Sequence, residues 1–465
     1  MLITMEIKQN IHITQPAVSK VRFAAGSAFA FLTKLQSAAP LIVFRVAFGV
    51  MMFLSLVRFA ANGWIDALYI QPKFFFTFYG FEWVKPLGAA GIYSVFAIMM
   101  VAALLIATGY LYRLASITFF LLFTYVELID KTNYLNHYYF ISIISFLLCL
   151  LPSTGNIFSL KNGIPQVPRW AILALQLQMA TVYFFAGIAK INTDWLLHAM
   201  PLKVWLPSKN ELPVIGNLLN EPALPYIFSW CGMLFDVCIA FFLFKRRTVW
   251  YAYAAVIIFH VLTAILFPGI GMFPFIMIVC ATVFLPVAFH EKLIQSAVDS
   301  RQSSINTNEQ PIKTPQLSIF SYQSILIIVL AIHFTVQALL PFRYTLYPGN
   351  LFTHEQGYRF SWRVMLMEKA GLVFFHVKTA NGKLIEINNH DFLTTQQEKQ
   401  MSTQPDMKWQ FAQHLKTVHN TDEVYAEAYV TINGMGSKLL IDPKVNLAAV
   451  EDDLTNKNWI LASAQ

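Results

Sequence analysis

The sequence contains few charged residues. Lysine, arginine, aspartate and glutamate make up 12% of its 465 residues, whereas they form about a quarter of an average soluble domain. Hydrophobic residues account for 57%, so the composition excludes an ordinary soluble protein and predicts an integral membrane protein in a lipid bilayer. The net charge of +8 does not indicate a nucleic-acid partner, because the basic residues stand in short clusters between apolar runs.

Cysteine and metal-binding patterns are scarce as well. The four cysteines all lie inside apolar runs, which excludes an outer domain held together by disulfides. The eleven histidines are scattered and no cysteine pair has ligand spacing in a polar setting, so we expect no metal. The sequence also lacks a glycine-rich phosphate loop and a nucleophile elbow. These absences exclude the commonest soluble enzyme classes.

Apolar runs of membrane-spanning length are abundant. We expect about nine spans, with the third and fourth run short. The predicted fold class is mainly α: a polytopic membrane helical bundle followed by a small β-rich soluble domain. An aromatic stretch, Lys73–Trp83, is expected to be interfacial or re-entrant. The nine runs are Leu41–Ala61, Leu87–Tyr110, Leu114–Ile129, Tyr138–Leu151, Trp170–Ile191, Tyr226–Phe244, Val249–Phe267, Ile270–Phe289 and Tyr322–Leu340.

The basic clusters predict the orientation of the chain. With a cytoplasmic N-terminus, Arg113 and the cluster Lys245–Arg247 fall in inner loops, as the positive-inside rule requires. Residues 1–40 would then be a cytoplasmic tail, residues 41–340 the transmembrane domain, and residues 341–465 a soluble domain on the outer face, whether periplasmic, extracellular or lumenal. The polar stretch Ser296–Gln316 has the composition of a solvated linker.

The soluble domain carries two hairpin signals. Leu372–Lys378 and Lys383–Ile387 flank Asn381-Gly382, the dipeptide most typical of a two-residue hairpin turn. Tyr425–Ile432 and Lys438–Ile441 surround a second Asn-Gly pair, and Trp409–Thr417 is expected to be a helix. The domain is therefore predicted to be β-rich with at least one covering helix.

A polar stretch, Asp130–His137, separates two strongly apolar runs, and we call it the polar knot. Ionisable residues at the mouth of membrane helices are costly unless they are paired or functional. Lys131 is either a snorkelling lysine that pairs with Asp130, or a lysine whose pKa is lowered by apolar surroundings so that it can act as a base. Asn136 and His137 are either an interfacial hydrogen-bonding pair or residues that orient a substrate.

Two further ionisable residues, Asp236 and His260, lie well inside predicted spans. Such residues are functional candidates by default. The structural alternative is that they pack against Arg45, Arg58 or Glu127.

The polar knot resembles a stretch of a known enzyme family. Asp130-Lys131-Thr132 followed by Asn136-His137 is similar to the Asp-Lys-Thr-Ser-Trp-Asn-Asn-His segment of the vitamin K-dependent γ-glutamyl carboxylases, whose membrane part defines the HTTM family. Five other stretches resemble segments of that family in the same order along the chain: Arg45–Gly49, Tyr183–Lys190 with the Asp194-Trp195 that follows, Phe259–Phe273, Tyr358–Met365 and Ile441–Val445.

The resemblance implies a membrane-embedded lyase with quinone epoxidase activity. Its base, matched by Lys131, would deprotonate reduced vitamin K, as phylloquinone or menaquinone hydroquinone. Reaction with O2 would give a strong base that removes a γ-proton from a glutamate-containing protein substrate, CO2 would add, and the quinone would leave as its epoxide. The polar shell around the quinone would be Asp130, Asn136, His137 and His260.

The resemblance also places Tyr358 and Trp362 in the region that presents the substrate glutamate, although both could simply anchor the β-rich core. Two departures weaken the carboxylation half of the reaction: Phe75 and Met367 stand where relatives carry histidines. Two alternatives therefore stay open, a quinol epoxidase that does not carboxylate and a non-catalytic membrane protein that binds lipid quinones.

Overall fold

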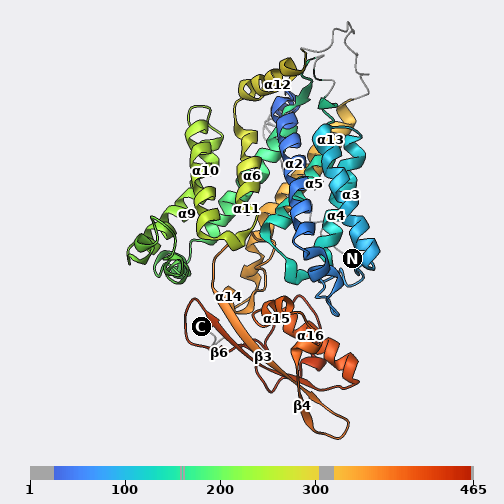
Figure 1. The fold of residues 1–465 in the computed structure, drawn as a ribbon, viewed down its shortest axis with the longest axis vertical. Coiled ribbons are helices and arrows are strands. Elements are labelled where there is room, and N and C mark those ends of the chain that lie inside the picture. Colours follow the sequence, from blue (N-terminus) through green and yellow to red (C-terminus); the bar gives the residue numbers. More distant parts are fainter. Residues whose placement is uncertain (1–25, 158–159, 161–162, 303–318, 462–465) are drawn as a thin grey trace, which may run out of the picture.

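The computed structural model describes residues 26–157, 160, 163–302 and 319–461. Most of the expected cytoplasmic tail and most of the expected linker Ser296–Gln316 lie outside these residues. The described chain forms a helical bundle at one end and a sheet domain at the other (Figure 1).

All nine apolar runs form helices, which confirms the mainly α membrane fold, but the count of complete spans is smaller than expected. Seven helices in the described chain are long and apolar enough to cross a membrane, or eight if a bent pair is one span. The fourth run gives a helix of only 15 residues. The eighth run breaks at Pro286 into segments bent by 105°, because proline cannot continue a helix. The helices are α2 (Ala39–Ala61), α3 (Ala89–Thr108), α4 (Tyr112–Ile129), α5 (Asn136–Leu150), α6 (Arg169–Ala189), α9 (Leu224–Leu243), α10 (Val249–Leu266), α11 (Phe273–Ala281), α12 (Val287–Gln302) and α13 (Ile319–Leu339).

Successive long helices run up and down the bundle, so their connections alternate between its two ends (Figure 1). Helices α2 and α3 pack closely because Gly49 has no side chain: a Cβ there would lie 2.5 Å from the Ala103 carbonyl oxygen. A two-stranded ribbon, β1 (Leu35–Ser37) with β2 (Gln166–Pro168), joins the starts of α2 and α6. The α9–α10 connection with its basic cluster lies at the end opposite the sheet domain.

The connection between α6 and α9 lies at the sheet-domain end and contains two short helices, α7 (Thr193–Leu196) and α8 (Leu202–Trp205). Both touch the sheet domain. Asn433 donates a hydrogen bond to the Asp194 carboxylate at 2.7 Å, and the Trp205 indole donates to Glu368. The polar knot, this connection and the sheet domain therefore meet on one side of the bundle.

The sheet domain contains four antiparallel strands in the order β4-β3-β5-β6. Both predicted hairpin pairings are confirmed, since β3 pairs with β4 around Asn381-Gly382 and β5 pairs with β6. The predicted helix is also confirmed, and its Phe411 ring packs 5.0 Å from that of Phe375 on β3. The elements are α14 (Leu351–His354), β3 (Lys369–Lys378), β4 (Leu384–Ile387), α15 (Thr395–Met401), α16 (Pro405–His419), β5 (Val424–Ile432) and β6 (Lys438–Leu439).

The aromatic stretch within Lys73–Trp83 lies between the bundle and the sheet domain and contains no helix. The Phe74 ring is 4.4 Å from that of His414 on α16, and Gln410 donates to the Thr77 carbonyl oxygen at 2.9 Å. The Phe76 carbonyl oxygen accepts a hydrogen bond from the Lys131 backbone at 2.8 Å. This stretch is therefore a spacer that connects α16 to the polar knot.

Candidate functional site

The polar knot is a tight turn between α4 and α5. Asp130 begins it, because its carboxylate accepts hydrogen bonds from the backbone N–H of Thr132 at 2.9 Å and from the Thr132 hydroxyl at 2.8 Å. Gln397 of α15 donates to the other carboxylate oxygen at 2.7 Å. Burial raises the pKa of Asp130 to about 6, although these hydrogen bonds oppose the shift. Asp130 thus holds the turn against the sheet domain and does not pair with Lys131, so the expected Asp130–Lys131 pairing is wrong.

Lys131 pairs instead with a residue of the sheet domain. Its side chain is only 5% exposed, and its ammonium lies 2.7 Å from Oδ2 of Asp406 at the start of α16. Arg359 contacts the same carboxylate at both oxygens, with Nη1 2.8 Å from Oδ2 and Nη2 3.2 Å from Oδ1. We call Lys131, Asp406 and Arg359 the ion triad. It connects the membrane bundle to the soluble domain through one shared carboxylate.

The triad holds two cations and one anion, and this imbalance shapes the pKa values. Burial lowers the pKa of Lys131, the carboxylate of Asp406 opposes that shift, and the guanidinium of Arg359 adds to it. Burial alone would raise the pKa of Asp406, but Arg359 and Lys131 together hold it well below its usual range. These two cations thus favour the ionised form of Asp406, and Arg359 contacts both of its oxygens. Lys131 is the group of the triad that can give up a proton.

Asn136 and His137 lie directly after the knot and have separate contacts. The Asn136 amide donates to the Arg363 carbonyl oxygen at 2.8 Å, and its oxygen accepts from the Tyr134 hydroxyl at 3.1 Å. His137 is buried, and its ring lies 6.0 Å from that of Phe273 at the start of α11. Asn136 therefore fixes the sheet-domain segment, whereas His137 faces the helices.

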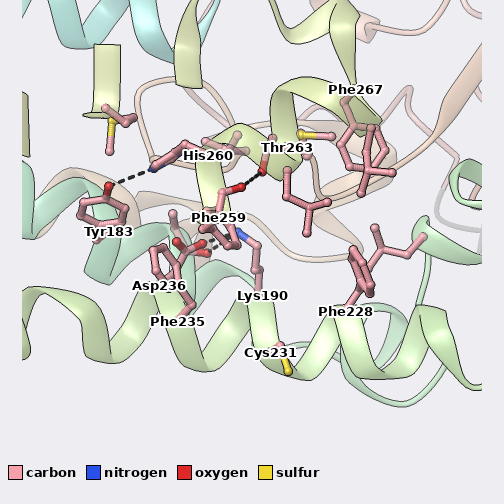
Figure 2. Close-up of a pocket in the computed structure, with 18 of the residues that line it drawn as sticks. Tyr183, Lys190, Phe228, Cys231, Phe235, Asp236, Phe259, His260, Thr263 and Phe267 are labelled. Atoms are coloured by element: carbon pink, nitrogen blue, oxygen red, sulfur yellow. Dashed lines mark hydrogen bonds and ion pairs between the residues drawn. The ribbon is translucent and has the colours of Figure 1, made fainter. Parts of the chain in front are cut away.

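A cavity of about 430 Å³ lies between α6, α9, α10 and the start of α11, and its wall is almost entirely apolar. Two polar pairs are set into this wall (Figure 2). The Tyr183 hydroxyl lies 2.9 Å from Nε2 of His260, and the Lys190 ammonium lies 2.8 Å from the Asp236 carboxylate. The expected structural partners of Asp236 and His260 are therefore wrong, because α6, and not α2 or α4, supplies both. Their functional interpretation stays a prediction.

His260 keeps one nitrogen without a partner. Among the described residues, no hydrogen-bond partner reaches its buried Nδ1, although the residue lines the cavity. Buried polar atoms are nearly always hydrogen-bonded, so an unpartnered one beside a cavity indicates a place where a ligand or water can bind. Within the described part of the chain, the apolar wall of the cavity thus contains a histidine whose buried Nδ1 has no hydrogen-bond partner.

Lys131 does not line this cavity, but two short segments join the cavity to the ion triad. Phe273 lies in the cavity wall and contacts His137, which follows Lys131 by six residues. Val364 also lines the cavity and follows Arg359 by five residues. The triad and the cavity are therefore connected through these two segments. Across the described residues, no group of three or more His, Cys, Asp or Glu side chains is placed to hold a metal ion.

The segment Glu355–Met365 adopts an unusual backbone. Four of its non-glycine residues have positive φ angles between 54° and 60°: Glu355, Phe360, Trp362 and Met365. Such residues cost about 1–3 kcal/mol each and persist only where the surroundings hold them in place. Aromatic contacts do so here, since Trp362 stacks 4.9 Å from Tyr139 and Phe360 lies 5.0 Å from Tyr134.

Of the two residues expected in the glutamate-presenting region, Trp362 is buried and Tyr358 is partly buried. Trp362 is buried against α5, and Tyr358 packs beside Phe352 with ring centres 6.5 Å apart. Neither lines the described cavities, so their contacts fit the anchoring alternative, and a role toward glutamate stays a prediction. The departures Phe75 and Met367 are partly buried in the apolar clusters of the bundle and of the sheet domain.

Sequence reasoning missed three of the residues that complete this region. Asp406 and Arg359 carry no pattern that links them to Lys131, because they meet it only when the sheet domain docks. Lys190 did have a signal, since it ends the stretch Tyr183–Lys190 that resembles the carboxylase family, but its pairing with Asp236 requires knowing that α6 packs on α9.

Comparison with known proteins agrees with the geometry. Residues 34–289 match the family model described as the HTTM domain. Residues 322–465 match the model described as the lumenal domain of vitamin K-dependent gamma-carboxylase. No solved structure matches the chain. Because these two matches cover the membrane bundle and the sheet domain in turn, the chain belongs to the vitamin K-dependent γ-glutamyl carboxylase family.

Proposed function

We propose that this chain is a membrane-embedded enzyme that oxidises a reduced lipid quinone with O2 to its epoxide and uses that reaction to add CO2 to a protein glutamate. Family membership supports the carboxylase class. The assignment of steps to residues is our proposal, and it rests on one observation: the carboxylate with which the buried Lys131 forms its ion pair, the only one found in the described part of the chain, is shared with an arginine.

That arrangement favours a neutral lysine. Asp406 and Arg359 already form a neutral pair, so a protonated Lys131 leaves a net positive charge in a largely buried site, which is costly. A neutral amine at Nζ can accept a proton from an acidic hydroxyl group. The ammonium that results then lies 2.7 Å from Asp406, whose carboxylate stabilises it. The triad thus makes Lys131 a base and holds its proton afterwards.

The residues of the cavity fit a quinone. Its volume of about 430 Å³ lies in the range of about 300–1,000 Å³ typical of small-molecule sites. The apolar wall suits a naphthoquinone ring and an isoprenoid or phytyl tail, and the unpartnered Nδ1 of His260 suits a quinol hydroxyl group. Reduced vitamin K, when bound, would supply the electrons whose transfer to O2 yields a base strong enough to remove a glutamate γ-proton.

The chain's own residues would perform three tasks around that chemistry. Phe273, Val364 and Met365, which line the cavity next to the ion triad, would exclude water from the reacting groups. Lys131 would take the quinol proton at Nζ. His137 and His260, whose rings flank Phe273 at 6.0 and 5.7 Å, would orient the quinol ring.

Orientation in the membrane follows from the same proposal. The name of the matched lumenal domain supports placing the sheet domain on the lumenal or outer side. The basic cluster Lys245–Arg247 at the opposite end supports a cytoplasmic position for that end and for the start of α2. A protein substrate would then reach the site from the outer side, while the quinone would enter from the bilayer.

One assay tests the proposal. Purified full-length protein would be given reduced menaquinone or phylloquinone, a glutamate-containing peptide and labelled bicarbonate, and both epoxide and fixed label would be measured. Lys131→Met should abolish both products because the amine is lost. Lys399→Met is the matched control, since Lys399 is an exposed lysine on α15 beside the knot. Unchanged epoxide formation by Lys131→Met would show that another group is the base.

A second candidate function is quinol oxygenation without carboxylation. It is favoured by Phe75 and Met367, which place apolar side chains, packed into the apolar clusters, where relatives carry histidines. Epoxide without fixed label in the same assay would select this candidate. The absence of both products, with quinone still bound, would select the non-catalytic quinone-binding protein.

A further inference from the structure

A second cavity, of about 370 Å³, lies outside the region described above, where α6 and α13 both end beside the sheet domain. We call it the interfacial cavity. Its wall is mixed. Apolar side chains from α6 and from the chain just after α13 form one part, and polar side chains from residues 192–194, 350, 361 and 363 form the other.

Arg363 is the cation of this cavity. The residue is only 9% exposed, and its guanidinium carbon lies 4.3 Å from the centre of the Tyr344 ring. Within the described residues Arg363 has no ion-pair partner, and its buried Nε has no hydrogen-bond partner. Burial lowers the pKa of Arg363, opposed by Tyr344. A buried guanidinium without an ion-pair partner is costly, so an anionic group of a ligand would be stabilised beside Arg363.

The cavity also contains one carboxylate. Asp194 lines it from α7, and one of its oxygens accepts a hydrogen bond from Asn433 at 2.7 Å. The cavity therefore presents a cation and an anion on its wall. A ligand that carries a negative and a positive group matches this pair better than a simple anion does.

The mouth of the cavity is apolar and faces the surroundings of the bundle. Ile191 is 54% exposed and Phe342 is 48% exposed, and both belong to the wall. The apolar surface continues along α13, where Ile332, Val336 and Leu339 are exposed. Because α6 ends at Ala189 and α13 at Leu339, the cavity lies at the height where membrane helices leave the bilayer, which is the level of lipid headgroups.

We propose that the interfacial cavity binds a phospholipid whose headgroup carries a phosphate and a primary ammonium, as in phosphatidylethanolamine. Arg363 binds the phosphate, Asp194 accepts a hydrogen bond from the ammonium, and the acyl chains lie along the exposed face of α13. A glutamate side chain of a peptide could supply the anion, but it would leave the exposed apolar face of α13 uncovered. A phospholipid would occupy both the charged cavity and this apolar face. This proposal does not depend on quinone chemistry at Lys131.

Native mass spectrometry of the full-length protein tests it. Phosphatidylethanolamine, phosphatidylglycerol and phosphatidylcholine with identical acyl chains would be added to the delipidated protein, and the adducts that survive activation would be counted. The wild type should retain phosphatidylethanolamine best. Arg363→Gln should weaken this binding about tenfold or more, because a charge-assisted contact is lost. Asp194→Asn should keep phosphate binding but lose the preference over phosphatidylglycerol.

Two further variants keep the test decisive. Arg246→Gln, which removes an exposed arginine at the opposite end of the bundle, should leave retention unchanged. Thr193→Trp, at an exposed position in the cavity wall, should displace the lipid without unburying Arg363, and it replaces Arg363→Gln if that variant does not fold. Equal lipid retention by the wild type and Thr193→Trp would overturn the proposal. So would a glutamate peptide that competes with the lipid and depends on Arg363.

Discussion

Replacing Arg359 with methionine should move the pH dependence of the enzyme to higher pH. Arg359 and Lys131 contact the same oxygen of Asp406, at 2.8 and 2.7 Å. Without Arg359, the Asp406 carboxylate pairs with Lys131 alone, and the positive charge of the guanidinium beside Lys131 is removed. Both changes favour the ammonium, so the pKa of Lys131 should rise. A base works only when it is neutral, and the variant therefore needs a higher pH to reach the same rate.

The size of this shift follows from the geometry. Two cations that share one carboxylate oxygen lie roughly 5 Å apart, and their repulsion is about 3 kcal/mol at an effective dielectric constant of about 20 but under about 1 kcal/mol in bulk water. The Asp406 side chain is 44% exposed, so solvent screens part of this repulsion. We expect about 1–1.5 kcal/mol, which corresponds to a rise of about one pKa unit.

The measurement is the rate of epoxide formation against pH for wild type and Arg359→Met. The acid limb should shift by about one unit to higher pH while the plateau rate stays similar. Gln404→Ala is the matched control, because Gln404 contacts the same guanidinium but carries no charge. If turnover is absent, the rate at which acetic anhydride modifies Lys131 at each pH gives the same pKa. An unshifted profile, or a shift to lower pH, would refute the role assigned to the triad.

Three other perturbations test the region. Lys190→Met should destabilise the protein by about 3–5 kcal/mol because it leaves the buried Asp236 unpaired, and adding Asp236→Leu to this variant should restore much of the lost stability. Thermal unfolding in detergent compares the wild type, the single variant and the double variant. Equal melting temperatures of the three proteins would contradict the pairing. Burial raises the pKa of Asp130 to about 6, above its unfolded value, so the folded state holds this proton more tightly. The wild type should therefore lose up to about 3 kcal/mol of stability as pH rises from about 4 to about 6, and Asp130→Asn should not. If the melting temperatures of the two proteins changed with pH in the same way, the buried Asp130 carboxyl would not be the cause. Phe75→His should increase labelled CO2 fixation relative to epoxide if the missing histidine limits carboxylation, and an unchanged ratio of the two products would count against that reason.

Local patterns predicted the fold well where the structure is decided by neighbouring residues. Asn381-Gly382 fixed the β3–β4 hairpin because a two-residue turn of this type needs only its own backbone and the flanking strands. The apolar runs likewise predicted helices correctly, because helix formation is also decided by residues that are close in the sequence. For the eighth run, hydropathy did not register the break at Pro286, which divides it into two segments bent by 105°.

The polar knot shows where sequence reasoning stops. The cost of placing charges at a membrane helix end identified Asp130–His137 as a candidate site without any structure. The same reasoning paired Lys131 with Asp130 because the two are adjacent, yet the partner is Asp406 on α16. A contact between distant segments depends on how two domains dock, and neither spacing nor composition carries that information.

Docking of the two domains also explains why the strained segment lies where it does. Arg359 lies within Glu355–Met365 and directly before Phe360, whose ring meets that of Tyr134 edge to face. Its position is therefore set by the backbone that Phe360 and Trp362 hold in place, and its guanidinium contacts Asp406. The same backbone continues into Val364 and Met365 in the wall of the apolar cavity. A movement of the sheet domain would therefore change the charge around Lys131 and the shape of the cavity together. We expect a ligand that displaces the sheet domain to alter both at once, because both depend on this one segment.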